Sequence, residues 1–270
     1  MPTGEPPKGP PAYAAAAGPP SQRAVRTDAA GLDAGETTIP CAGFDWPAYM
    51  AKPAGGRDLP VVLVAQEIFG LHEHIKDVCR RLAKAGRLAI APDTFARHGD
   101  ALNAPDIAAV RAIVARVPDS ETMAVFDAAL AFAATQGGDP ARAAVTGFCW
   151  GGRSAWLYAA HNPRLRACIP WYGRLDGERT PNALRWPLDI APELRVPTLG
   201  LYGGADPSIP ADVVGTMRAR LAASGAPAEI VVYDSAPHAF FADYRDSYRE
   251  AAAQDAWRRM LAFLEAQGVA

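Results

Sequence analysis

The fold is decided by the stretch AAVTGFCWGG, which occupies residues 143–152. Its first four residues are small or β-branched and predict a buried strand over 143–146, and the stretch after it predicts a helix from about 152 to 161. Between the two lies the pattern glycine-x-cysteine-x-glycine, with Cys149 at its centre. A strand-to-helix turn this sharp leaves almost no room for side chains beside its central residue, so glycine is needed on both sides. The pattern therefore predicts Cys149 at the tip of such a turn.

Cys149 has two interpretations at this place. The start of a helix offers unpaired backbone N–H groups and the positive end of the helix dipole, and both favour a thiolate and a developing oxyanion. Cys149 would then be a nucleophile. Cysteine is also a common small apolar residue in buried turns, and Cys149 would then be structural. The strand–turn–helix setting favours the nucleophile.

The rest of the chain alternates short apolar runs with amphipathic stretches. The run LPVVLVA at 59–65 is β-branched and too short for a buried helix, so it predicts a central strand. Further strands are expected at 88–91, 143–146, 167–171, 198–202 and 229–233. Helices are expected around 75–86, 107–117, 123–133, 152–161, 211–223 and 257–264. The alternation predicts an α/β fold with a mostly parallel central sheet and helices on both faces, whose functional residues follow the carboxyl ends of the strands.

Residues 1–36 differ from the rest in composition. They are rich in Pro, Ala and Gly and show no sustained period, which predicts a flexible or loosely attached N-terminal extension. From Thr37 to the end the pattern is that of a globular protein, without an internal repeat or a second linker. A single domain over 37–270 is therefore expected.

Charge and cysteine content argue against several classes of protein. A formal net charge of −2 gives no electrostatic reason to expect a nucleic acid or an anionic membrane as partner. No apolar run approaches the roughly 20 residues that span a bilayer, and the N-terminus lacks the apolar core of a secretory signal. The four cysteines are widely spaced without a CxxC pair, which argues against a structural zinc site and a dense disulfide framework. We expect a cytoplasmic protein without a metal, in which Cys41, Cys79 and Cys168 are core residues.

An acid and a histidine follow two of the later strands. Asp206 lies just past the strand at 198–202, where its carboxylate can orient a histidine or, alternatively, cap the next helix. His238 lies five residues past the strand at 229–233, where a surface-loop role is the alternative. The chain order nucleophile, acid, histidine is that of the α/β-hydrolase fold. We therefore predict this fold, with Cys149 as nucleophile, His238 as base and Asp206 as the acid that orients the base.

For two groups of side chains near strand ends, the sequence allows two locations each. Four histidines are expected in solvent or at the rim of the cleft, and those at 72 and 98 could face the cleft: His72, His74, His98 and His161. Three aromatic residues either line an apolar substrate pocket or pack in the core: Trp150, Trp171 and Tyr172.

Five stretches of the chain occur together in one known family. They are QEIFG at 66–70, PDTFAR at 92–97, GFCWGG at 147–152, the Asp206 loop and HAF at 238–240. With them the chain resembles the dienelactone hydrolase family, the carboxymethylenebutenolidases, from about Thr37 to the C-terminus.

The resemblance implies roles for four further residues. Glu67 would contact the resting thiol and help to generate the thiolate when substrate binds. The backbone N–H groups of Ile68 and Trp150 would form the oxyanion hole, and Arg97 would help to hold a substrate carboxylate. The chemistry of Glu67 agrees with its role, because a carboxylate beside a thiol disfavours a second negative charge and keeps the thiol protonated. Alternatively, Glu67 pairs with a cation such as Arg97.

One position departs from the family. Members that act on dienelactone usually carry a second arginine four residues after the histidine, where this chain has Ala242. Arg245 lies nearby in the sequence. Because paired charge-assisted bonds are the strong ones, the loss of one arginine makes dienelactone itself a doubtful natural substrate.

These observations predict a hydrolase that cleaves a small ester or lactone through a covalent cysteine thioester, without a cofactor. A non-catalytic ligand-binding or thiol-sensing protein on the same scaffold is the alternative from another class. Acyl transfer to an acceptor other than water would use the same residues. A monomer or a small homo-oligomer is expected.

Overall fold

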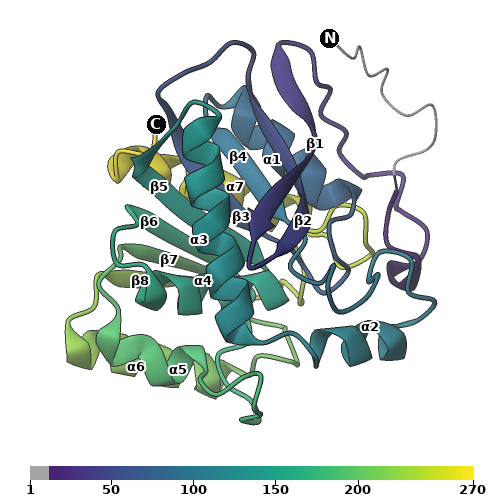
Figure 1. Ribbon diagram of the computed structural model, residues 1–270. Coiled ribbons are helices and arrows are strands. Elements are labelled where there is room, and N and C mark those ends of the chain that lie inside the picture. Colours follow the sequence, from purple (N-terminus) through teal and green to yellow (C-terminus); the bar gives the residue numbers. More distant parts are fainter. Residues whose placement is uncertain (1–11) are drawn as a thin grey trace.

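The computed structural model describes residues 12–270, whose strands form one eight-stranded sheet (Figure 1). The strands are β1 (Leu32–Cys41), β2 (Phe44–Pro53), β3 (Leu59–Ala65), β4 (Leu88–Pro92), β5 (Gly138–Phe148), β6 (Ala167–Trp171), β7 (Thr198–Gly203) and β8 (Ala228–Tyr233). Their order across the sheet is β1-β2-β4-β3-β5-β6-β7-β8. Strands β3 to β8 pair in parallel, whereas β1 pairs with β2, and β2 with β4, in antiparallel fashion. The mostly parallel sheet is thus confirmed.

Helices cover both faces of the sheet. They are α1 (Glu73–Lys84), α2 (Ile107–Val114), α3 (Asp119–Thr135), α4 (Trp150–His161), α5 (Pro187–Ile190), α6 (Ala211–Ser224) and α7 (Glu250–Ala266), with 3-10 turns at Ala15–Ala17 and Ala191–Glu193. In Figure 1, α3 and α4 lie in front of the sheet and α1 and α7 behind it. Because parallel strands are joined by crossovers, this covering buries the central strands on both sides.

The structure contains a hairpin that was not expected. Strands β1 and β2 pair along their whole length, from Leu32 with Pro53 to Cys41 with Phe44. The two residues of the turn, Ala42 and Gly43, both have positive φ, of 51° and 72°. Such turns suit the natural twist of a two-stranded hairpin. The hairpin extends the parallel sheet by an antiparallel edge.

Residues 12–36 are not a loosely attached extension, contrary to the expectation from their composition. Ala14 is 1% exposed, the Ala15 N–H donates to the Leu102 carbonyl at 3.0 Å, and the Ser21 N–H donates to the Tyr244 carbonyl at 2.9 Å. Strand β1 begins at Leu32, so the boundary expected after residue 36 falls inside a strand. We call residues 12–17 the N-terminal arm. Residues 1–11 of the expected extension lie outside the described residues.

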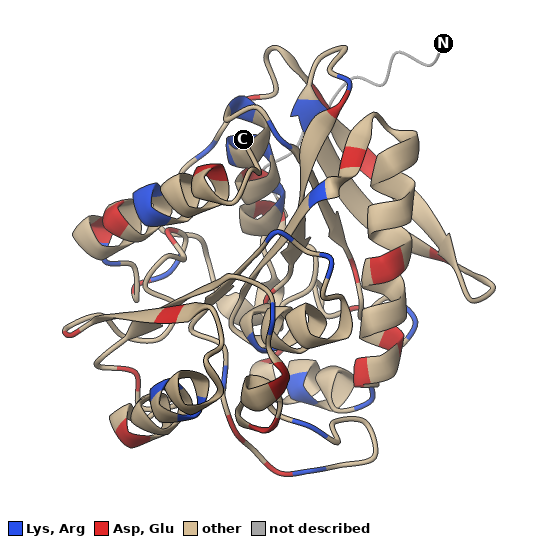
Figure 2. Cartoon of the chain, turned by 90° about the vertical axis from the view of Figure 1, so that its left-hand side faces the viewer, with Lys and Arg blue, Asp and Glu red and all other residues tan. Residues whose placement is uncertain are grey.

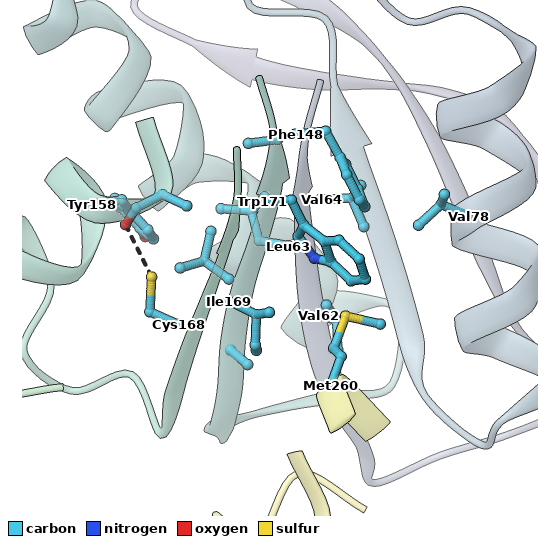
Figure 3. Close-up of a cluster of buried hydrophobic side chains, with 14 of the residues drawn as sticks. Val62, Leu63, Val64, Val78, Phe148, Tyr158, Cys168, Ile169, Trp171 and Met260 are labelled. Carbon is cyan, nitrogen blue, oxygen red and sulfur yellow. Dashed lines mark hydrogen bonds between the residues drawn. The ribbon is translucent and has the colours of Figure 1, made fainter. Parts of the chain in front are cut away.

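The core below the carboxyl ends of the strands is closely packed (Figure 3). Trp171, the last residue of β6, has no exposed surface, packs on Phe148 at 5.4 Å between ring centroids, and donates its indole N–H to Thr146 Oγ1 at 3.1 Å. Of the two interpretations of Trp171, core packing is the observed one, and the assignment to a substrate pocket was wrong. Cys79 and Cys168 are also fully buried, and burial raises the pKa of both thiols.

Charges of both signs are mixed on the surface (Figure 2). On α7, for example, Asp255 pairs with Arg258 and with Arg259, at 2.9 and 2.6 Å. Among residues 12–270, no helix has both the length and the apolar character needed to cross a bilayer.

Candidate active site

The turn between β5 and α4 places Cys149 beyond the carboxyl end of a central strand. Cys149 has φ 56° and ψ −113°, a strained conformation for a residue with a side chain. Its N–H donates to the Trp171 carbonyl at 3.1 Å, and its carbonyl accepts from the Arg153 N–H at 3.2 Å. Helix α4 begins at the next residue, Trp150, so the thiol lies at the N-terminal end of a helix.

The glycines on either side of Cys149 are required by contacts with the backbone. A Cβ atom on Gly147 would lie 2.1 Å from the carbonyl oxygen of Gly151, and one on Gly151 would lie 2.3 Å from the carbonyl oxygen of Ala65. Both distances are far below van der Waals contact. The turn therefore packs directly on the end of β3, and the loop that carries Glu67 begins there.

The structure brings Cys149, His238 and Asp206 together. His238 Nδ1 lies 2.6 Å from Asp206 Oδ2, and Cys149 is near enough to the imidazole to influence its pKa. Asp206 Oδ1 accepts from the backbone N–H of Ser208 at 2.8 Å and from its hydroxyl at 2.6 Å. The Asp206 side chain has no exposed surface, whereas that of His238 is 27% exposed. The histidine thus reaches solvent while the carboxylate behind it does not.

Charges within this set stabilise each other. Burial opposes the charge of His238, but its hydrogen bond to Asp206 and its interaction with Cys149 outweigh burial and raise the pKa of His238 to about 10. Burial also opposes the charge of Asp206, yet the hydrogen bonds from His238 and Ser208 lower the pKa of its carboxyl below the usual value.

Two backbone N–H groups lie on the segments that meet at the Cys149 turn. Trp150 is the first residue of α4, where helical N–H groups have no partner within the helix. Ile68 lies in the turn after β3, the strand end that contacts Gly151. Within residues 12–270, neither N–H donates to a protein acceptor. Both N–H groups can therefore donate hydrogen bonds to an oxygen atom that becomes negatively charged.

Glu67 is held by residues that were not expected. Its side chain is buried, and Oε2 accepts from the Tyr244 hydroxyl at 2.7 Å and from His72 Nε2 at 3.1 Å. Burial alone would raise the pKa of Glu67, but the bond and charge of His72, the charge of His74 and the Tyr244 bond lower it to about 2. The carboxylate is therefore ionised without a contact to Arg97, and the alternative pairing with that residue was wrong.

The expected solvent position is wrong for two of the four histidines. His72 and His74 are 0% and 1% exposed, and His74 Nδ1 lies 3.4 Å from Asp243 Oδ1. The hydrogen bond to Glu67 offsets part of the cost of burying the His72 imidazole. His98 and His161 lie at the surface or partly buried and pair with acids.

Arg97 and Tyr172 occupy different surroundings. Arg97 Nη1 pairs with Glu121 Oε2 at 2.8 Å, and its guanidinium stacks over the rings of Phe44 and Trp46. Its known contacts are thus with α3 and the β1–β2 hairpin. The Tyr172 ring, in contrast, meets the His238 ring edge to face at 5.2 Å, and its buried hydroxyl has no partner within the described chain.

Two supporting residues were missed in the sequence. Ser208 follows Asp206 by two positions, and an acidic residue that accepts from a residue two positions on is a recognisable turn signal. Tyr244 has no such signal, because it meets Glu67 from 177 positions away. Its role depends on how the loop after β8 lies over the loop after β3.

Relatives match the chain along nearly its whole length. The model described as "Dienelactone hydrolase family" matches residues 46–268. Proteins named "Putative carboxymethylenebutenolidase" from Salmonella typhimurium and Escherichia coli are each 51% identical, over 96% and 95% of this chain and 97% and 95% of their own.

Solved structures agree with this match. One described as "Putative Dienelactone Hydrolase" from Klebsiella pneumoniae is 54% identical, with a TM-score of 0.84 over 87% of this chain and 98% of that chain. An acylaminoacyl peptidase from Pyrococcus horikoshii is 14% identical, with a TM-score of 0.69 over 87% of this chain and 42% of that chain, a likeness of fold alone. Together with the strand order, these likenesses identify the α/β-hydrolase fold.

Proposed function

The chain belongs to the dienelactone hydrolase family, and on that premise we propose that this hydrolase cleaves a small ester or lactone through a covalent thioester on Cys149. The observation that carries the proposal is the position of His238, which is hydrogen-bonded to Asp206 and packs on Tyr172, the residue after the one whose carbonyl accepts from the Cys149 N–H. A histidine between a nucleophile and a carboxylate can take a proton, hold it and return it during acyl transfer.

The first half of the reaction joins the Cys149 sulfur to the substrate carbonyl carbon. His238 takes the thiol proton, and Asp206 stabilises the imidazolium that results. The carbonyl oxygen becomes negatively charged and accepts hydrogen bonds from the N–H groups of Ile68 and Trp150. The intermediate then expels the alkoxide, which takes the proton from His238, and an acyl thioester remains.

The second half consumes one water molecule. His238 removes a proton from the water, whose oxygen attacks the thioester carbonyl. The intermediate collapses, the sulfur leaves and takes the proton back from His238, and the carboxylic acid is released. The negative charge of Glu67 disfavours a free thiolate before substrate binds, so the resting thiol is protected from other electrophiles.

The test compares hydrolysis of p-nitrophenyl acetate by wild type, Cys149→Ala and Cys41→Ala. Cys41 is a half-buried cysteine at the end of β1 and serves as the matched control. Because the thioester needs the sulfur, Cys149→Ala should lower kcat/KM by about 1,000-fold or more, and Cys41→Ala should leave it unchanged. Equal rates for wild type and Cys149→Ala would overturn the proposal. A mass increase equal to the acyl group, on wild type but not on Cys149→Ala, would show the thioester directly.

A further inference from the structure

The Glu67 carboxylate is held through one of its two oxygen atoms. Oε2 accepts both hydrogen bonds, from the Tyr244 hydroxyl and from His72 Nε2, whereas Oε1 is buried and has no partner within residues 12–270. A phenol has one proton and a neutral imidazole has one N–H, so each donor is fully used by this contact. The arrangement leaves Oε1 as the free acceptor.

The two donors come from separate parts of the fold. His72 precedes α1, on the loop after β3, and Tyr244 lies on the loop after β8. Their rings pack against each other at 5.0 Å, and both side chains are at most 1% exposed. Rotation of the Glu67 carboxylate would break two buried hydrogen bonds at once, so these residues restrict it to one orientation.

The set adjoins the proposed catalytic residues. Tyr172 contacts the His238 ring and follows Trp171, whose carbonyl accepts from the Cys149 N–H, and the negative charge of Glu67 helps, after burial, to raise the pKa of Tyr172. Tyr172 is thus a neighbour of both Glu67 and Cys149, and its own hydroxyl has no partner in the described chain. The loop that carries Glu67 also packs on the turn that carries Cys149, since a Cβ atom on Gly151 would lie 2.5 Å from the Gln66 carbonyl oxygen.

We propose that Tyr244 and His72 are positioning residues, which keep the Glu67 carboxylate ionised and turned in one direction beside Cys149. The idea rests on the proposed function only in that Glu67 influences the reactivity of the Cys149 thiol. The titratable and charged groups around Glu67 come from five parts of the chain: Tyr13, His72, His74, Cys149, Tyr172, Asp243, Tyr244 and Arg245.

The substitution Tyr244→Phe tests the role, since it removes one hydroxyl and keeps the ring. Tyr158→Phe is the matched control, because the Tyr158 hydroxyl also donates to a carboxylate, Asp127, at 2.9 Å, but on the far part of α4. The measurement is the rate of Cys149 alkylation by iodoacetamide as a function of pH. It reports on the thiol without any turnover.

In wild type the pKa of Glu67 is about 2, so Glu67 stays ionised throughout the measured range. Burial raises the pKa of Glu67, and the Tyr244 hydrogen bond counteracts it. Without the Tyr244 hydroxyl, the pKa of Glu67 therefore rises. Protonation then removes a negative charge beside the thiol. We expect Tyr244→Phe to gain an acid-side inflection above about pH 4 and to be alkylated about fivefold faster than wild type near about pH 5. Tyr158→Phe should follow wild type.

Two further variants keep the test decisive. Adding Glu67→Gln to Tyr244→Phe should abolish the new inflection, because glutamine does not titrate. If Tyr244→Phe does not fold, His72→Leu, which removes the other donor, should give the inflection, and His72→Gln, which restores a donor, should lose it. A Tyr244→Phe profile that superimposes on wild type, or an inflection that survives Glu67→Gln, would overturn the proposal. Failure of wild type to hydrolyse esters would instead count against the proposed function alone.

Discussion

The strained turn at Cys149 packs closely because Gly147 and Gly151, two positions away on either side, have no side chains. The carbonyl of Ala65 approaches Gly151 so closely that a methyl group there would lie 2.3 Å from it. This contact joins the end of β3 to the start of α4, and so sets the distance between the turn that holds Ile68 and the thiol. The geometry of the site therefore depends on the lack of a side chain at Gly147 and at Gly151.

Replacing Gly151 with alanine should therefore cost both stability and activity. The added methyl group must displace backbone, so we expect a loss of about 3 kcal/mol in the free energy of unfolding and loss of most esterase activity. Gly215→Ala is the control, since Gly215 lies within α6 and nothing is within 4 Å of an added Cβ atom. It should be neutral or stabilising by up to about 1 kcal/mol. Urea denaturation followed by circular dichroism measures both, and equal stabilities of the two variants would contradict the packing argument.

The candidate residues differed in how far the sequence could place them. Cys149, Asp206 and His238 lie together, as expected, because each follows the carboxyl end of a strand and parallel strands share that edge. The surroundings of Glu67 and Arg97 could not be placed in this way. Their partners depend on how separate loops and the hairpin lie over one another, which strand order alone does not determine.

At the scale of elements, the parallel strands were predicted and the hairpin was not. Strands β3 and β6 have the expected bounds because strands buried on both faces form continuous apolar runs. Strand β1 is an edge strand with one fully buried residue, Ile39, and it contains Gly35 and Pro40. Its pattern is close to that of a loop, because the antiparallel edge leaves most of its side chains in solvent.

The N-terminal arm gives a prediction at this scale. Ala14 packs within an apolar cluster that includes Phe69 and Phe95, and Trp150 lies at the edge of the same cluster. An aspartate there would bury an unpaired charge or detach the arm, so Ala14→Asp should lower the free energy of unfolding by about 2 kcal/mol. The neighbouring exposed Ala15 provides the control, and Ala15→Asp should be within about 0.5 kcal/mol of wild type. Thermal melts of both variants measure the difference. Equal melting temperatures for the two variants would mean that the arm does not contribute to stability.

For the whole molecule, buried carboxylates set the response to acid. The pKa of Glu67 is lowered to about 2, and the pKa values of Asp206 and Asp243 are also below their usual range. Groups of this kind stabilise the folded state above the unfolded pKa of about 4 and lose that contribution as the pH falls through the folded value.

The contribution of these carboxylates to stability should therefore be level between about pH 7 and pH 5 and should fall steeply below about pH 4. Because Glu67→Gln removes one of the three titrations, its stability should decrease less steeply with falling pH than that of wild type, whatever its level at neutral pH. Chemical denaturation at a series of pH values gives both slopes. Parallel slopes would mean that Glu67 contributes nothing to acid sensitivity.

The match to the family begins at residue 46, inside β2, whereas the sheet begins at Leu32. An expression plasmid designed from that boundary would encode a polypeptide without β1, and Trp46, which has no exposed surface in the full chain, would become its N-terminal residue. The new edge of the sheet would be a bare strand that can pair with another molecule, which is a common route to inclusion bodies. Cloning should therefore keep the residues upstream of the family boundary.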